Sequence, residues 1–355
     1  LRVMSVEQIL QRLTDRFALL STGSRGAPAR QQTLQWCIDW SYELCTPAEQ
    51  ELWGQLSVFS GSFELDAVQG ICTGTGAVGQ VVDLVASLID KSILIREEDA
   101  AGAVRYRMLE TLRDYGIERL QDTGEFASLV GRHRNWYESG VLRAESDWIS
   151  ARQVAWLVRL DAEQSNIVAA LQFCLTGPRE AEVGLRMAAA LYPYWRVRGR
   201  LREGMRWLAQ LLTVQDGEAS VERIKALYVL SVLSGLHGDP EASALYAERG
   251  AVLAAELGDR TAGALMADAA GQHALITHDC ATACECFESS LEVFRKDGHL
   301  LYMIWSLLGL ALASDADENQ TRSEECYREI LALTEPRGEF IYRGWALWGL
   351  GVSSW

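Results

Sequence analysis

The chain has 355 residues, of which 49% are hydrophobic, enough apolar surface for roughly two or three well-packed domains. Its 33 Lys and Arg and 48 Asp and Glu give a formal net charge of −15. Such a chain repels phosphate groups unless its basic residues gather on one face, which disfavours DNA and anionic membranes as main partners. It shows no signal peptide and no long apolar run, so we expect a cytoplasmic protein.

The first predicted helix covers residues 5–20, where apolar residues recur at helical spacing. A Gly/Ser/Pro loop follows, and then QTLQWCIDWSYEL (32–44) predicts a second helix. We interpret its Trp36, Trp40 and Tyr42 as packing residues. The chain begins abruptly at Leu1, in residues that resemble the end of a helix, and it ends inside another helical pattern. We therefore expect a fragment of a longer protein.

Thr46 marks the start of the next helix. It is a suitable N-cap, Pro47 suits the first helical position, and Glu49 completes a capping box. Further helices are predicted at 64–72 and 78–90.

Two short β-type runs come next, at 92–96 and 104–108, on either side of the polar loop EEDAAGA. They predict a β-hairpin. Helices followed by a hairpin are the components of a winged helix, so residues 1–122 are assigned to a winged-helix-type domain with a preceding helix. Residues 123–215 are predicted to form a helical linker and a divergent helical repeat.

The last part of the chain, 216–355, is repetitive. Four similar segments are centred on small residues about 40 positions apart, namely Ser231, Gly271, Gly309 and Gly349. In the first three copies a second helix follows with an aromatic residue, namely Tyr246, Phe287 and Tyr327. Small residues let paired helices approach, and the aromatic residue fills the gap against the next pair. This pattern predicts tetratricopeptide-like (TPR-like) repeats, truncated at the end. The predicted fold class is mainly α, a winged helix followed by a helical solenoid.

Several stretches resemble bacterial STAND-class ATPase regulators of the AfsR/LuxR-like and MalT-like kind. They are RQQTLQWCIDWSYELCTPAEQELWGQLSVFSGSFELDAVQGIC (30–72), LIDKSILI (88–95), RYRMLETLRDYGIERL (105–120) and LDAEQSNIVAALQF (160–173). In that family a nucleotide-binding domain precedes a winged helix and helical repeats that receive a signal. The resemblance implies the C-terminal part of such a regulator, without the nucleotide-binding domain.

No phosphate-binding loop of the GxxxxGK[ST] type occurs in the sequence, and the Gly-rich run TGTGAVGQ (73–80) has no Lys. The five histidines also lack a nearby Ser or Cys in a nucleophile-type turn. We expect a non-enzymatic chain without a cofactor, ATP or ADP being bound only by an upstream domain. In many related ATPases a Met-His-Asp motif contacts the nucleotide. The resemblance places Met108, Leu109 and Glu110 at that corner, where Leu109 can donate no hydrogen bond.

Two clusters of polar residues are candidate sites. The group His278, Cys280, Cys284 and Cys286 lacks the paired knuckles of structural zinc, so we expect no metal and interpret the eight cysteines as reduced core residues. The second cluster contains Trp195, Arg196, Arg198, Arg200, Arg202 and Arg206. It is either a solvated turn or part of a groove that binds an anion or acidic peptide.

The function predicted is that of a regulatory module. By the resemblance, the winged helix restrains the upstream nucleotide-binding domain, and the repeats bind a protein, a peptide or a small-molecule inducer. The alternative is a DNA-binding winged-helix transcription factor. The segments 47–57 and 64–72 contain no Lys or Arg, and the wing loop is acidic, so no direct DNA contact is expected.

Overall fold

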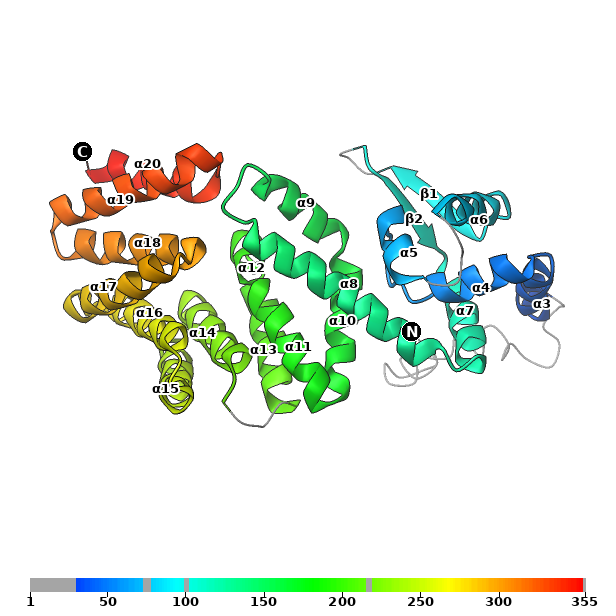
Figure 1. The fold of residues 1–355 in the computed structure, drawn as a ribbon, viewed down its shortest axis with the longest axis horizontal. Helices are drawn as coiled ribbons and strands as arrows, with labels where there is room; N and C mark the ends of the chain where they lie inside the picture. Colours follow the sequence, from blue (N-terminus) through cyan, green and yellow to red (C-terminus); the bar gives the residue numbers. More distant parts are fainter. Residues whose placement is uncertain (1–29, 73–77, 99–101, 215–218, 354–355) are drawn as a thin grey trace, which may run out of the picture. The chain divides into compact units, whose positions relative to one another are not determined.

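The computed structural model describes residues 30–72, 78–98, 102–214 and 219–353. The chain divides into two compact units, Leu1–Trp136 and Tyr137–Trp355, and each is described by itself (Figure 1). The helix predicted at 5–20 lies outside the described residues.

The first unit contains helices and one β-hairpin. Its elements are α3 (Arg30–Glu43), α4 (Pro47–Leu56), α5 (Leu65–Ile71), α6 (Val78–Asp90), β1 (Leu94–Glu98), β2 (Val104–Met108), α7 (Glu110–Asp122) and the first half of α8 (Phe126–Ser146). The strands are antiparallel, with Leu94 opposite Met108, and Phe63 adds a bridge to Tyr106. The predicted helices and hairpin are confirmed, the first strand beginning two residues later than expected.

The predicted capping box at the start of α4 is present. The Glu49 backbone N–H donates to the Thr46 hydroxyl, and the Thr46 N–H donates to the Glu49 carboxylate at 2.6 Å. The same carboxylate accepts hydrogen bonds from Ser87 of α6 and from Lys91. One buried acid therefore both caps α4 and ties it to α6.

The core of the first unit forms around Trp53, whose indole N–H donates to the Leu112 carbonyl at 2.9 Å. Tyr42 packs edge-on against Trp53, as predicted. The prediction was wrong for the other two aromatic residues of α3. Trp36 and Trp40 are 64% and 54% exposed and stack on each other, because they lie one turn apart on the side of α3 that faces away from the core.

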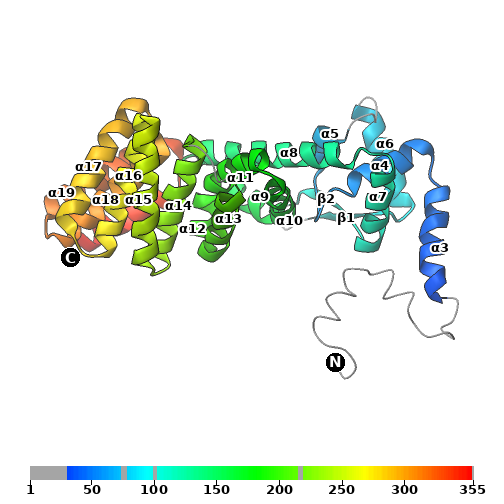
Figure 2. The ribbon, with the colours of Figure 1, turned by 90° about the horizontal axis from the view of Figure 1, so that it is seen from below.

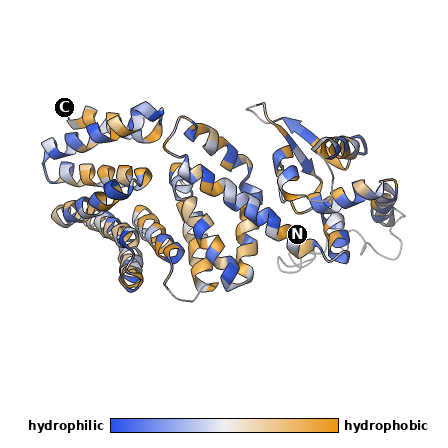
Figure 3. Cartoon of the chain, in the orientation of Figure 1, coloured by the Kyte–Doolittle hydropathy of each residue, from blue (hydrophilic) through white to orange (hydrophobic). Residues whose placement is uncertain are grey.

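The second unit is all helical among its described residues. After the rest of α8 come α9 (Gln153–Ala162), α10 (Gln164–Phe173), the 3-10 turn η1 (Cys174–Thr176), α11 (Pro178–Ala190), α12 (Tyr192–Val197), α13 (Leu201–Val214), α14 (Val221–Leu236), α15 (Pro240–Leu257), α16 (Arg260–Ile276), α17 (Cys280–Asp297), α18 (Leu300–Ala316), α19 (Gln320–Thr334), η2 (Glu335–Arg337) and α20 (Ile341–Ser353). Successive helices stand side by side (Figures 1 and 2). Hydrophilic and hydrophobic residues mix along them (Figure 3), as in amphipathic helices that bury one side.

The structure repeats every 40 residues from α15 onward. The N-caps of α15, α17 and α19 are Asp239, Asp279 and Asn319. The turns that follow these helices end in left-handed glycines, Gly258, Gly298 and Gly338. Left-handed backbone favours glycine, because a Cβ would clash there. Equivalent N-caps and left-handed glycines at a fixed interval of 40 residues confirm the predicted TPR-like repeat.

The predicted pairing of glycine with an aromatic ring is also present. A Cβ added to Gly309 would lie 2.4 Å from the Phe287 ring, and one added to Gly349 would lie 2.3 Å from the Tyr327 ring. The aromatic residue of one pair thus packs against the glycine of the next. In the first repeat Ala247 occupies the corresponding position, eight residues after the N-cap, and Tyr246 is half-buried beside it.

Candidate functional site: a helix–hairpin domain and the inner side of the repeats

The helix before the hairpin, α6, has an exposed side without basic residues. Among its described side chains, the exposed ones are Gln80, Val82, Asp83, Ala86 and Asp90. A helix that enters a DNA groove needs donors and positive charge on that side. This side of α6 offers two carboxylates instead.

Two of the three arginines of the hairpin pair with acids, whereas the third, Arg96, is exposed. Arg105 is buried and bonds to Glu64 at 3.0 Å and to Ser62. Arg107 pairs with Glu97 at 2.8 Å. These pairings lower the positive charge that the hairpin can offer to a phosphate backbone.

Residues 46–121, which include α4–α7 and the hairpin, match the family model of the winged helix-turn-helix domain. This part of the chain is a winged helix. The winged helix accounts for about a fifth of the chain.

Longer similarities extend beyond the winged helix. A protein of Mycobacterium tuberculosis named "Putative HTH-type transcriptional regulator" is 39% identical over 217 residues, which are 60% of this chain and 24% of that protein. An uncharacterized protein of the same species is 32% identical over 133 residues, 37% of this chain and 34% of that protein. The chain thus spans about a quarter to a third of the length of these relatives.

Among solved structures, a STAND protein with a tetratricopeptide repeat sensor from Pyrococcus horikoshii matches this chain. It is 16% identical with a TM-score of 0.49, and the match covers 99% of this chain and 54% of that chain.

The corner predicted from the ATPase motif lies where β2 of the winged helix passes into α7. Met108 is buried opposite Leu94, whereas Leu109 is 45% exposed and precedes the first turn of α7. Glu110 lies in that first turn, where the helix dipole favours a carboxylate. The corner therefore exposes one apolar and one acidic side chain, Leu109 and Glu110.

On the inner side of the repeats, four aromatic residues form a cluster, which we call the aromatic cluster. Its members are Tyr192, Tyr228, Tyr302 and Trp305, from α12, α14 and α18. The rings of Tyr192 and Trp305 meet edge-to-face with centroids 4.7 Å apart. Helices α14, α16 and α18 lie along an arc that faces α12 (Figure 1). The cluster thus joins α12 to α14 and α18, the helices at the two ends of the arc.

Asp268 of α16 is buried at the aromatic cluster. Its carboxylate accepts a hydrogen bond from the Tyr228 hydroxyl at 3.0 Å and one from the Ser306 hydroxyl at 2.6 Å. Burial raises the pKa of Asp268 to about 6, although these two hydrogen bonds and the charge of Arg196 oppose the shift. The inner side of the repeats therefore holds a carboxyl group that changes charge near neutral pH.

Two basic residues adjoin the aromatic cluster. Arg196 is half-buried and donates to the Tyr192 hydroxyl at 3.2 Å. Lys225 pairs with Glu145 of α8 at 2.6 Å. Burial raises the pKa of Tyr302 to about 12 even though the neighbouring Lys225 lowers it, so the phenol stays neutral and can donate hydrogen bonds.

Most of this site was missed from the sequence. Of its members, only Arg196 was predicted as a site residue. Asp268 carried a signal that could have been used, because it lies 40 residues after Tyr228 and 40 before Leu308, inside the apolar run of α16. The repeat period alone places it on an inner, buried position.

The residues of the predicted arginine groove make separate contacts with different partners. Trp195 is 2% exposed and packs against Gly204, so it is a core residue. The arginines have their own partners: Arg198 pairs with Asp161, Arg200 with Glu203 and the Tyr194 ring, Arg202 with His237, and Arg206 lies over the Trp207 ring. Only Arg196 faces the aromatic cluster.

The start of α9 contacts the start of α20, 186 positions later in the chain. The Gln153 amide N–H donates to the Glu339 carboxylate at 2.7 Å, and the Gln153 carbonyl oxygen accepts from the Ile341 N–H. Glu339 also accepts from the backbone N–H groups of Tyr342 and Arg343. We call this set the closure contact. It is buried, with Gln153 and Glu339 each 1% exposed.

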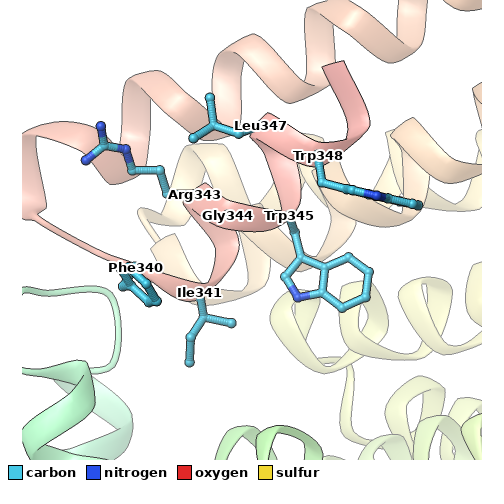
Figure 4. Close-up of a pocket in the computed structure, with 7 residues that line it drawn as sticks. All are labelled: Phe340, Ile341, Arg343, Gly344, Trp345, Leu347 and Trp348. Carbon is cyan, nitrogen blue, oxygen red and sulfur yellow. The ribbon is translucent and has the colours of Figure 1, made fainter. Parts of the chain in front are cut away.

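Helix α20 presents an exposed apolar side. Phe340, Trp345, Leu347 and Trp348 border a hollow of about 680 Å³ (Figure 4). The residues 40 positions earlier, Leu300, Trp305, Leu307 and Leu308, include three fully buried side chains, because α19 and other helices cover α18. The apolar side of α20 is exposed because no later helix among the described residues covers it.

Two classes of site receive no support within the described ranges. No group of three or more His, Cys, Asp or Glu there could hold a metal ion. No helix there is long and apolar enough to cross a membrane.

Proposed function

We propose that the chain is the non-catalytic regulatory and sensor part of a cytoplasmic STAND-type regulator. The winged helix contacts a nucleotide-binding domain of the same protein and restrains it, and the repeats bind a protein, a peptide or a small inducer. The observation that carries the proposal is the exposed side of α6, which presents Asp83 and Asp90 and no basic residue, as suits a winged helix that contacts protein.

The proposed sensing role is supported by the inner side of the repeats. The aromatic cluster, Asp268 and Arg196 join helices from both ends of the arc. A signal that binds the closed and the open arc with different affinity would shift the balance between them. The restraint would then be released without any chemistry in this chain.

The alternative function is direct DNA binding by the winged helix. It is favoured by the match to the winged helix-turn-helix family. The name of the mycobacterial relatives as HTH-type transcriptional regulators points the same way. A regulator of that kind can also bind DNA through another part of a longer chain.

The two functions are separated by a salt-dependent DNA titration of the purified chain. We expect no saturable binding of a random-sequence duplex at 150 mM salt. Affinity that falls steeply with salt, as counterion release requires, would establish the alternative.

A second titration tests whether the winged helix restrains the nucleotide-binding domain. That domain, produced separately, should bind this chain more tightly with ADP than with ATP. Equal affinity in both states would contradict the restraint.

A further inference from the structure

Arginines from two elements surround a hollow between the end of α8 and α9, which we call the arginine hollow. Arg143 lies in the last turn of α8, Arg152 is the N-cap of α9, and Arg159 lies in the last turn of α9. All three line the same hollow of about 470 Å³. The only acid in its lining is Asp147, against three guanidinium groups, in a chain whose net charge is −15.

The one carboxylate of the hollow holds its other groups in position. Asp147 pairs with Arg152 at 2.7 Å and accepts a hydrogen bond from the Trp156 indole N–H at 2.6 Å. Although burial opposes it, these two contacts hold the pKa of Asp147 below its ordinary value. The acid therefore stays ionised near neutral pH, and the guanidinium and the indole are held in place before any ligand arrives.

The lining matches one class of ligand. Guanidinium groups bind carboxylates through paired N–H donors, and the half-buried Trp156 indole offers a flat surface for a planar group. A volume of about 470 Å³ is within the usual range for small-molecule sites. Three arginines on separate turns suit several carboxylates spread over one molecule better than a single small ion.

We propose that the arginine hollow binds a planar small molecule that carries two or more carboxylates. Its place in the fold gives such a ligand a route to the rest of the repeats. Arg152 is followed directly by Gln153, whose side chain makes the closure contact with Glu339. A ligand that holds Arg152 would steady the start of α9 and with it the closed arc. This consequence rests on the proposed sensing function, whereas the binding itself does not.

The test is a calorimetric titration of the full chain with benzene-1,3,5-tricarboxylate at 150 mM salt. We expect saturable binding at one site per chain. Arg143→Gln and Arg159→Gln should each weaken it about tenfold, the loss expected for one charge-assisted contact. Arg328→Gln, on the exposed side of α19, is the matched control and should leave the affinity unchanged. Arg152 is left intact because its removal would take a partner from Asp147.

A spectroscopic measurement places the ligand independently. The indole N–H resonance that disappears in Trp156→Phe should shift on titration of the original chain, and circular dichroism should show each variant folded. Equal affinity in all variants would overturn the proposal. So would binding of sulfate or polyglutamate as tight as that of the tricarboxylate, since these would indicate a simple ion site or an acidic-peptide site. The DNA titration, which tests the proposed function, is independent of these two measurements of the arginine hollow.

Discussion

At the scale of single residues, Asp268 shows how tertiary contacts change a common side chain. An acid whose pKa is higher in the folded state than in the unfolded chain costs stability once it ionises. For Asp268 the pKa rises from 3.8 to about 6. Its cost is absent below about pH 4, grows through pH 6, and reaches about 3 kcal/mol above that, at 1.4 kcal/mol per pKa unit.

We therefore expect Asp268→Asn to become more stable relative to the original chain as pH rises. Asn is neutral; its carbonyl oxygen can accept from one of the two hydroxyls, Tyr228 or Ser306, and its amide N–H can donate to the other. The difference in unfolding free energy should move in favour of the variant by up to about 3 kcal/mol between pH 4 and pH 7. Urea unfolding at several pH values measures it. Parallel curves for the two proteins would show that Asp268 does not titrate in this range.

At the scale of helices, the glycines at the contacts between pairs limit how closely the repeats stack. Gly309 of α18 lies under the Phe287 ring, where an added Cβ would be 2.4 Å from the ring. Phe287 is fully buried, so the ring has little room to move. Gly263 of α16 is exposed, and nothing lies within 4 Å of its added Cβ.

The two glycines should respond oppositely to alanine. Gly309→Ala is expected to destabilise the chain by about 1–2 kcal/mol, because overpacking outweighs the gain in helix propensity. Gly263→Ala should stabilise it by about 0.5–1 kcal/mol, because only the propensity changes. Thermal unfolding followed by circular dichroism compares them. A stabilised Gly309→Ala would mean that the pairs can separate slightly without cost.

At the scale of the whole second unit, the closure contact joins the start of α9 to the start of α20. Its hydrogen bonds are buried, so removing one partner leaves buried polar groups unsatisfied. Such a contact is therefore expected to hold the start of α20 to the start of α9.

We expect Gln153→Ala to speed hydrogen exchange at Ile341 and Tyr342 about tenfold, since 1.4 kcal/mol is a factor of ten. Gln210→Ala, on the exposed side of α13, is the control and should leave these rates unchanged. Exchange is measured by mass spectrometry on peptides that cover α20. Unaltered rates in Gln153→Ala would show that the capping of α20 by Glu339 is sufficient without α9.

The features that could be predicted from the amino-acid sequence are local or periodic. The capping box at Thr46, the hairpin and the 40-residue period depend on neighbouring residues or on regular recurrence, and all are present in the structure. They could be predicted because turn and cap preferences act over a few residues and because each repeat packs mainly on the next.

Which side chains meet across long stretches of the chain follows from tertiary packing. Sequence patterns could not show that Trp36 and Trp40 are exposed, that the arginines of 196–206 have separate partners, or that Gln153 reaches Glu339. The exposure of the two tryptophans depends on which side of α3 packs on the core of the first unit, whereas the contacts within the second unit depend on the curvature of the stacked helix pairs. That curvature is the sum of small rotations between neighbours, and no single residue or pair of residues specifies it.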